Sequence, residues 1–110
     1  MSGAVHGEAE LTGRVGRLFL EAIRLDMEDV DAARDRAREA LEDGVGGFIV
    51  FGGTVPDVAR LADDLRREAD HPLWFAADLE RGAGQQFDGA ATLPPPAGLA
   101  AHPSPEEAVR

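Results

Sequence analysis

The sequence predicts an α/β fold with a parallel sheet, because stretches of helical periodicity alternate with short apolar runs along the middle of the chain. Residues 46–51 and 73–77 are the two clearest apolar runs, and glycine or proline lies next to each of them. The connections between the expected elements are short. Such connections favour right-handed βαβ units, in which a helix links two parallel strands.

The beginning of the chain has the weakest patterning. Residues 1–10 are acidic, rich in small side chains and without periodicity, so we expect this segment to be disordered. Leu11, Val15 and Leu18 follow at helical spacing. Residues 18–23 then form a short apolar run, interrupted by one glutamate, which is consistent with a first strand.

Residues 30–43 predict the first clear helix. Asp29 or Asp31 can cap its amino end, its apolar residues recur at helical spacing, and Gly44 is a suitable stop. The apolar run at residues 46–51 follows. A continuous run of this kind is typical of a strand that is buried on both faces of a parallel sheet.

A second clear helix is predicted from Thr54 to Ala69. Thr54 is a suitable N-cap, a proline follows early, and an acid stands three residues after the threonine. The His-Pro pair at residues 71–72 ends this helix, and residues 73–77 predict a second buried strand. The expected order is therefore helix, strand, helix, strand.

A long connection follows this part of the chain. Residues 79–101 contain no clear element, and loops of this length in compact domains are usually functional. The Ser-Pro-Glu-Glu sequence at residues 104–107 then has the pattern of a helix start. The sequence reaches Arg110 before such a helix completes its second turn, so we expect the chain to be a fragment of a larger domain.

Composition disfavours several classes of partner. The formal net charge is −10, from 21 acids and 11 bases, whereas nucleic acids and anionic membranes require a basic surface. There is no cysteine, so the chain has neither disulfides nor thiolate chemistry. No apolar stretch is long enough to span a bilayer and none resembles a secretory signal, so we expect a cytoplasmic location. His6, His71 and His102 lie far apart, and we expect neither a metal nor a cofactor.

Asp78 and Glu80 are the strongest candidates for a functional site. They follow the apolar run at residues 73–77, and ligands of β/α proteins bind where strands give way to loops at their carboxyl ends. Residues two apart in an extended chain point to the same side, about 6.6 Å apart. A glycosidase acid and its nucleophile flank the bond from opposite sides, so this pair is better suited to hold a substrate than to cleave one.

Three roles remain open for these acids. The first is the catalytic pair, for which retaining glycosidases need carboxyl groups about 5–5.5 Å apart. In the second, Asp78 accepts hydrogen bonds from sugar hydroxyls while Glu80 supports the loop or pairs with an arginine. In the third, both acids cap the strand end and Glu80 bonds Arg81. The neighbouring Gln85 and Gln86 are expected to satisfy backbone groups of the loop rather than to bind a sugar.

Other motifs are weaker indications of a functional site. The Gly-Ala-Gly sequence at residues 82–84 resembles part of a phosphate-binding loop, but no helix start follows it and the chain has no lysine. The two glycines at residues 52–53 predict a plain turn. Trp74 and Phe75 alternate along their strand, so one can line a pocket, although burial against a helix is the favoured role.

Four pieces of the sequence, in their order and spacing, resemble the N-terminal barrel domain of glycoside hydrolase family 3. They are residues 44–51, residues 72–82, Phe87 and residues 92–95. The similarity is greatest to the β-N-acetylhexosaminidase and β-glucosidase type, and it extends over residues 11–101. It implies that residues 11–110 form the N-terminal portion of a (β/α)8 barrel of the TIM type, which needs about 250 residues. The parallel sheet would then be incomplete, with an open edge.

The resemblance also implies roles for single residues. In that family the aspartate of an Asp-x-Glu motif binds hydroxyls of the sugar in the cleavage subsite, and Asp78 matches this aspartate. Glu80 matches the second acid, in a supporting role. Arg81 replaces the glycine that usually follows, and Ala83 stands where an arginine is common. The nucleophilic aspartate and the acid/base of the family lie farther along, so the resemblance implies no catalytic residue here and no activity of this chain alone.

These observations define the expected function. The resemblance implies the N-terminal fragment of a retaining glycoside hydrolase that acts on O-glycosyl bonds of β-linked N-acetylglucosaminides or glucosides in carbohydrate metabolism. The expected partners are the carbohydrate substrate and the missing C-terminal part of the barrel. The alternative is a non-catalytic sugar-binding or assembly module that completes its sheet by oligomerisation. A small flavodoxin-like domain would need a phosphate-binding loop after an early strand, and the sequence contains none.

Overall fold

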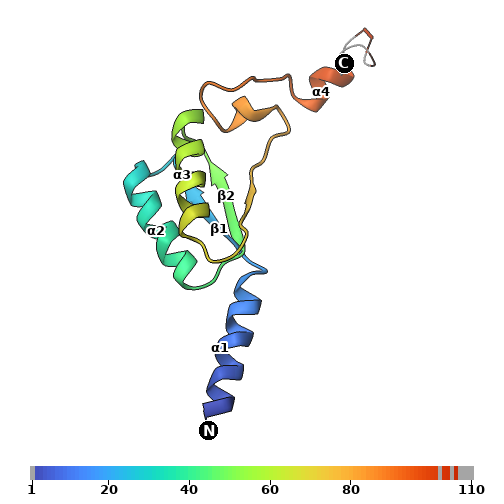
Figure 1. The fold of residues 1–110 in the computed structure, drawn as a ribbon. Coiled ribbons are helices and arrows are strands. Elements are labelled where there is room, and N and C mark those ends of the chain that lie inside the picture. The colour runs from blue at the N-terminus through green and yellow to red at the C-terminus, as the bar shows by residue number, and fades with distance from the viewer. Residues whose placement is uncertain (1, 102, 105, 107–110) are drawn as a thin grey trace.

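A computed structural model describes residues 2–101, 103–104 and 106. Helices and strands alternate through the middle of the chain, while α1 projects from one end of this body and α4 lies beyond the other (Figure 1). The elements are α1 (Ser2–Gly16), β1 (Leu20–Arg24), α2 (Val30–Glu42), β2 (Gly47–Phe51), α3 (Val55–Glu68), β3 (Trp74–Ala76), a short 3-10 helix (Ala83–Gln85) and α4 (Pro96–Ala100).

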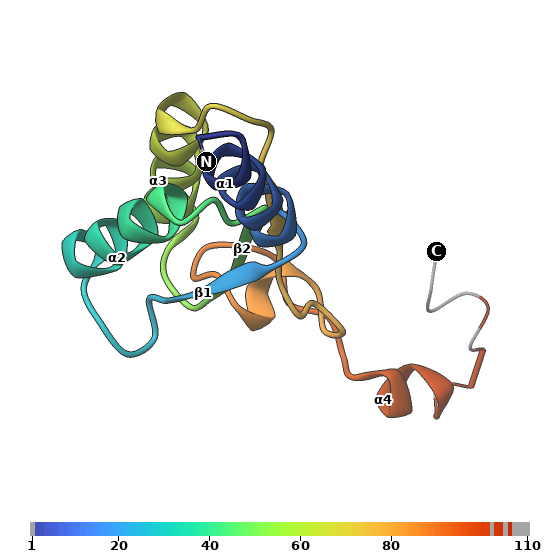
Figure 2. The same ribbon diagram turned by 90° about the horizontal axis from the view of Figure 1, so that it is seen from below.

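The three strands form one parallel sheet in the order β1-β2-β3. The register aligns Ile23 of β1 with Val50 of β2, and Phe48 of β2 with Phe75 of β3. The connecting helices α2 and α3 lie on the same side of the sheet in both views (Figures 1 and 2). The predicted α/β fold with a parallel sheet is therefore confirmed.

Local sequence signals explain where α2 and α3 begin. The Asp29 carboxylate accepts a hydrogen bond from the backbone N–H of Ala32 at 2.8 Å, and the Thr54 hydroxyl accepts one from that of Asp57 at 3.2 Å. Each bond satisfies one of the backbone donors that a helix start leaves unpaired. Asp29 and Thr54 are thus the N-caps, as the sequence predicts.

The core lies between the sheet and these two helices. Side chains of the strands meet three alanines of α2 and two leucines of α3, and the small alanines let α2 approach closely. Phe48 at the centre is fully buried, and its ring lies 5.9 Å from that of Phe75. The buried apolar residues are Ile23, Ala33, Ala37, Ala40, Val45, Phe48, Val50, Leu61 and Leu65.

Ion pairs join the outer surfaces of α2 and α3. Arg38 binds Glu68 through three hydrogen bonds of 2.7–3.0 Å, and Arg34 reaches Asp64 at 3.3 Å. The Arg38 hydrogen bonds hold the pKa of the Glu68 carboxyl below its usual value. The Arg38–Glu68 pair is exposed and the Arg34–Asp64 pair is partly buried, so the first fixes the orientation of the helices more than it stabilises the fold.

The opposite face of the sheet is open, which corrects the prediction that the second and third strands are buried on both sides. Trp74 is 75% exposed and Leu20 of β1 is 45% exposed, while Ile49 and Phe51 are only partly covered. The apolar segments that form β2 and β3 contain enough apolar residues for burial on both faces. In the described part of the chain, however, no element covers this face, and β3 is an edge strand.

The ends of the chain differ from the sequence-based expectation. Helix α1 begins at Ser2, within the segment expected to be disordered; its two alanines and two glutamates favour a helix, although its four glycines oppose one. The long connection contains the 3-10 helix and α4. The helix start expected at residues 104–107 lies partly outside the described residues. None of the described helices combines the length and the apolar character that crossing a membrane requires.

Leu65→Ala should lower the free energy of unfolding by about 2–5 kcal/mol, because it opens a cavity at a fully buried position of α3. Urea denaturation followed by circular dichroism measures the change. The matched control is Leu93→Ala, whose side chain is 53% exposed and should cost less than about 1 kcal/mol. Equal losses in the two variants would contradict this description of the core.

Candidate functional site

The carboxyl ends of the parallel strands meet at one edge of the sheet, and the connection that follows β3 passes over this edge (Figure 1). After β2, Gly52 and Gly53 have φ values of 76° and 91°, which side chains with a Cβ rarely allow. Their turn leads directly into the N-cap Thr54. After β3, the chain passes through Asp78 and Glu80 into the loop.

Gln86 ties the end of β2 to the end of β3. Its Oε1 accepts a hydrogen bond from the backbone N–H of Gly52 at 3.2 Å, and its Nε2 donates to the backbone carbonyl of Asp78 at 3.4 Å. Both partners are backbone groups, and the Gln86 side chain is partly buried. The prediction that this glutamine satisfies loop backbone is confirmed, and its role is to hold two strand ends together.

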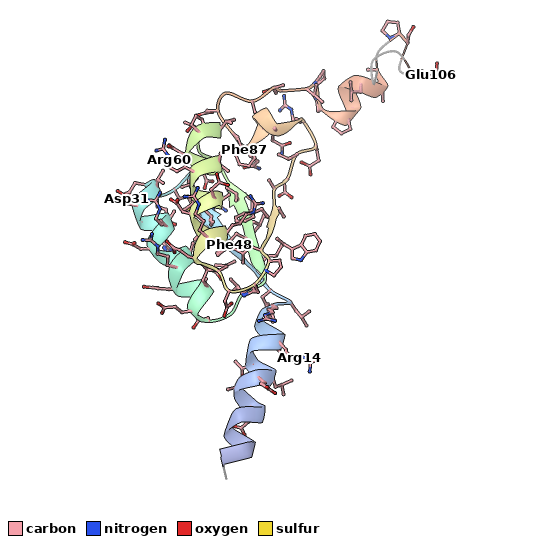
Figure 3. The ribbon with its side chains drawn as sticks, in the orientation of Figure 1. Arg14, Asp31, Phe48, Arg60, Phe87 and Glu106 are labelled. Carbon is pink, nitrogen blue, oxygen red and sulfur yellow. The ribbon has the colours of Figure 1, made fainter. Side chains whose placement is uncertain are left out.

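The loop also pairs with the β2–α3 turn through its backbone. The Asp88 N–H donates to the Gly53 carbonyl at 2.9 Å, and the Asp88 carbonyl accepts from the Val55 N–H at 3.0 Å. Sequence reasoning missed this contact, because pairing of a single backbone residue has no side-chain pattern. The one available signal is the neighbouring Phe87, which packs against the core below the loop (Figure 3).

Close internal contacts make the loop compact. The Leu93 N–H donates to the Arg81 carbonyl and the Gly84 N–H donates to the Ala91 carbonyl, both at 2.7 Å. A Cβ at Gly84 would lie 2.3 Å from the Thr92 hydroxyl oxygen, so only glycine fits at this position. The loop therefore resembles an Ω-loop, a compact surface loop packed by its own groups.

Glu80 is bonded within the loop. Its carboxylate accepts a hydrogen bond from the Gln85 Nε2 at 3.0 Å, and the Gln85 Oε1 accepts one from the Arg81 backbone N–H at 2.8 Å. The Gln85 side-chain bond, followed by a backbone bond, holds the pKa of the Glu80 carboxyl below its usual value. In the described chain Glu80 thus bonds Gln85, whereas one sequence-based interpretation has it bond Arg81.

Asp78 stands next to this braced segment with its side chain at the surface. Its backbone carbonyl is held by Gln86, so its position relative to β2 is fixed although its carboxylate is accessible to solvent. Glu80 is exposed as well. The structure therefore brings both predicted site residues to the carboxyl edge of the sheet and leaves the Asp78 carboxylate accessible to a ligand.

A shallow hollow beside this edge is rich in acids. Its polar lining includes Asp26, Asp29, Asp57, Asp88 and Gln86. Arg24 pairs with Asp26 at 2.7 Å, and Asp29 is occupied as the α2 cap. Among the described residues, no group of three histidines or acids is arranged to hold a metal ion. An edge with so many acceptors suits a neutral ligand with hydroxyl donors better than it suits an anion.

Gln86→Ala should loosen the link between the strand ends, because it leaves the partly buried N–H of Gly52 without its acceptor. The expected loss is about 1–3 kcal/mol, with faster amide hydrogen exchange at Gly52. Gln85→Ala is the control, because that side chain is exposed and does not contact Gly52. Unchanged exchange at Gly52 in Gln86→Ala would rule out the bracing role.

The lowered pKa of Glu80 gives a pH test. A carboxyl whose pKa is depressed in the folded state stabilises the fold above its unfolded pKa, and this contribution is lost as the pH falls through the folded pKa. The Gln85–Glu80 contact should therefore weaken below about pH 4.5. Gln85→Ala should raise the Glu80 titration midpoint measured by NMR, whereas Glu68, bonded to Arg38, should titrate unchanged. A Glu80 midpoint that Gln85→Ala leaves in place would argue against this bond.

Comparison with known proteins assigns no family to the chain, because no model of a protein family matches it and no curated protein matches it significantly.

Proposed function

We propose that this chain supplies the sugar-holding N-terminal part of a retaining glycoside hydrolase of the family 3 type. The observation that carries the proposal is the place of Asp78, just beyond β3 at the carboxyl edge of a parallel sheet, with its side chain accessible. In the family that the sequence resembles, an aspartate following a strand in this way binds hydroxyls of the sugar. A carboxylate accepts such bonds strongly, because a charged acceptor makes shorter and stronger hydrogen bonds.

The strand order supports a barrel portion as the setting of this site. In a TIM-type barrel, helices lie outside each strand and the inner face is filled by side chains of other strands. Here the strands follow one another in sequence order, α2 and α3 lie on one face, and Leu20 and Trp74 remain exposed on the other. The first three strands of a flavodoxin-like sheet instead lie in the order 2-1-3, so the sequential order β1-β2-β3 favours a barrel over that fold.

The hydrogen bonds around the site suggest a different role for each residue in this proposal. Asp78 accepts hydrogen bonds from the sugar, and Gln86 fixes its backbone. Glu80 is engaged with Gln85, so it supports the loop. Retaining hydrolysis also requires a nucleophile and an acid/base that flank the glycosidic bond. We assign neither role to a residue of this chain, and in the proposal the remainder of the barrel provides both.

A second function is favoured by the open face of the sheet. Leu20 and Trp74 expose apolar area next to the unpaired backbone of two edge strands, and such edges commonly pair with another chain. The chain would then be a non-catalytic sugar-binding or assembly module that completes its sheet by oligomerising. The two functions share the Asp78 site and differ in what covers the open face.

Asp78→Asn should weaken binding of N-acetylglucosamine or glucose about tenfold, because it removes a charged acceptor. Two-dimensional NMR titration of the chain with each sugar measures this affinity. Asp63→Asn is the matched control, since that exposed aspartate belongs to α3 and not to the loop. Equal affinities in the two variants would reject the sugar-holding role.

The chain alone should not hydrolyse a chromogenic N-acetyl-β-glucosaminide or β-glucoside. This outcome is the one expected if bond cleavage depends on residues outside the chain. Turnover by the purified chain that disappears in Asp78→Ala would contradict the proposal, because it would make Asp78 a catalytic residue.

A further inference from the structure

His71 is a titratable side chain that the proposed function does not use. It lies in the connection between α3 and β3, at the amino edge of the sheet, whereas Asp78 follows the carboxyl end of β3. Only 9% of its side chain is exposed. Protein groups therefore surround the ring, and the contacts of its two nitrogens determine which protonation state fits the structure.

One ring nitrogen of His71 extends the pairing of β2 with β3. The Nε2 atom lies 2.8 Å from the backbone carbonyl oxygen of Val45, in the connection that precedes β2. Beside it, the Trp74 N–H donates to the Gly46 carbonyl at 3.0 Å. A carbonyl oxygen can only accept a hydrogen bond, so Nε2 carries a proton and donates it to Val45.

The other ring nitrogen faces a carboxylate. Nδ1 lies 2.7 Å from Oδ1 of Asp70. In a neutral ring with its proton on Nε2, Nδ1 has only a lone pair, which would repel the oxygen lone pairs at this distance, so a proton lies between the two atoms. The hydrogen bond from His71 lowers the pKa of the Asp70 carboxyl, and the Asp70 side chain is 91% exposed. Both observations favour an ionised carboxylate and a ring that is protonated on both nitrogens.

Other charged groups near the ring come from several elements. The charged side chains that line a shallow hollow together with His71 are Arg38, Glu42, Glu68 and Asp70. Arg38 and Glu68 are hydrogen-bonded to each other, and Arg17, from the connection before β1, contributes to the lowered pKa of Asp70. In the described part of the chain, Asp70 is the one acid that forms an ion pair with the ring.

We propose that His71 is a proton-dependent clamp at the amino edge of the sheet. The doubly protonated ring binds Val45 and Asp70 at once. When Nδ1 loses its proton, Nε2 keeps its bond to the buried Val45, and the exposed Asp70 carboxylate turns into the solvent. The Asp70 contact thus stabilises the fold while the ring is charged, and this contribution is lost as the pH rises through the range in which histidines change charge, about pH 5 to 8.

The clamp also has an acidic limit. Asp70, whose pKa is lowered in the folded state, contributes stability above its ordinary value of 3.8, and this contribution is lost as the pH falls through the folded pKa. The contact therefore operates between the protonation of Asp70 and the deprotonation of His71. It lies at the opposite edge of the sheet from Asp78, so this inference does not depend on the proposed function.

The test compares the stability of the whole chain at about pH 5.5 and about pH 8 by urea denaturation followed by circular dichroism. Asp70→Asn should lower the ratio of folded to unfolded chain about fivefold at the lower pH and leave it unchanged at the higher pH, because only the charged ring binds the carboxylate strongly. His71→Gln, whose amide can still donate to Val45, should also lose more stability at the lower pH. There, the double variant should lose no more than His71→Gln alone, because both changes break the same contact.

The matched control is Asp63→Asn, which removes the same charge from an exposed position of α3. Its effect on stability should be the same at both pH values. An Asp70→Asn loss that does not depend on pH, or single losses that simply add in the double variant, would overturn the proposal. If His71→Gln fails to fold, Asp70→Asn alone decides, since that side chain is exposed.

Discussion

Burial of one face of the sheet against α2 and α3 is the constraint on which the rest of the structure depends. Phe48, Leu61 and Leu65 have almost no exposed surface, and they connect the middle strand to α3. Burial of large apolar side chains is the main favourable term in folding, so this layer sets the position of every strand. The buried contact between the sheet and the helices fixes the strand register, and the register determines where each strand ends. This contact therefore also determines the geometry of the carboxyl edge.

Polar bonds then fix the loop on this edge. Gln86 connects Gly52 with Asp78, and the Asp88 backbone pairs with the β2–α3 turn. These contacts join segments that lie far apart in the sequence, and they leave the Asp78 carboxylate exposed. A ligand-binding group on a loop is useful only when the loop backbone is held, since ordering a mobile loop on binding costs free energy. The hydrogen bonds of Gln86 thus fix the backbone at Asp78 while its side chain stays exposed, as the proposed binding role requires.

Much of the fold could be predicted because its signals are local. The caps Asp29 and Thr54 and the apolar spacing of α2 and α3 are contained within each element, and the role of Gln86 followed from its loop context. The exposure of Trp74 and the pairing of Asp88 could not be predicted. Burial of a strand face depends on what other segments supply, and one-residue backbone pairing has no side-chain signature. The same pattern in β2 and β3 suits one-sided or two-sided burial, and tertiary structure decides between them.

The surfaces left uncovered differ in kind, and this difference bears on how they would be covered. The open face of the sheet is apolar around Leu20 and Trp74 and is bordered by strand edges, and in the barrel that we propose other strands would cover it. Helix α1 instead exposes Leu11 and Val15 beside charged side chains of both signs. Helix α1 leads into the amino edge of the sheet, whereas the loop that carries Asp78 lies on the carboxyl edge at the opposite end, so a contact made by α1 leaves the carboxyl edge free (Figure 1).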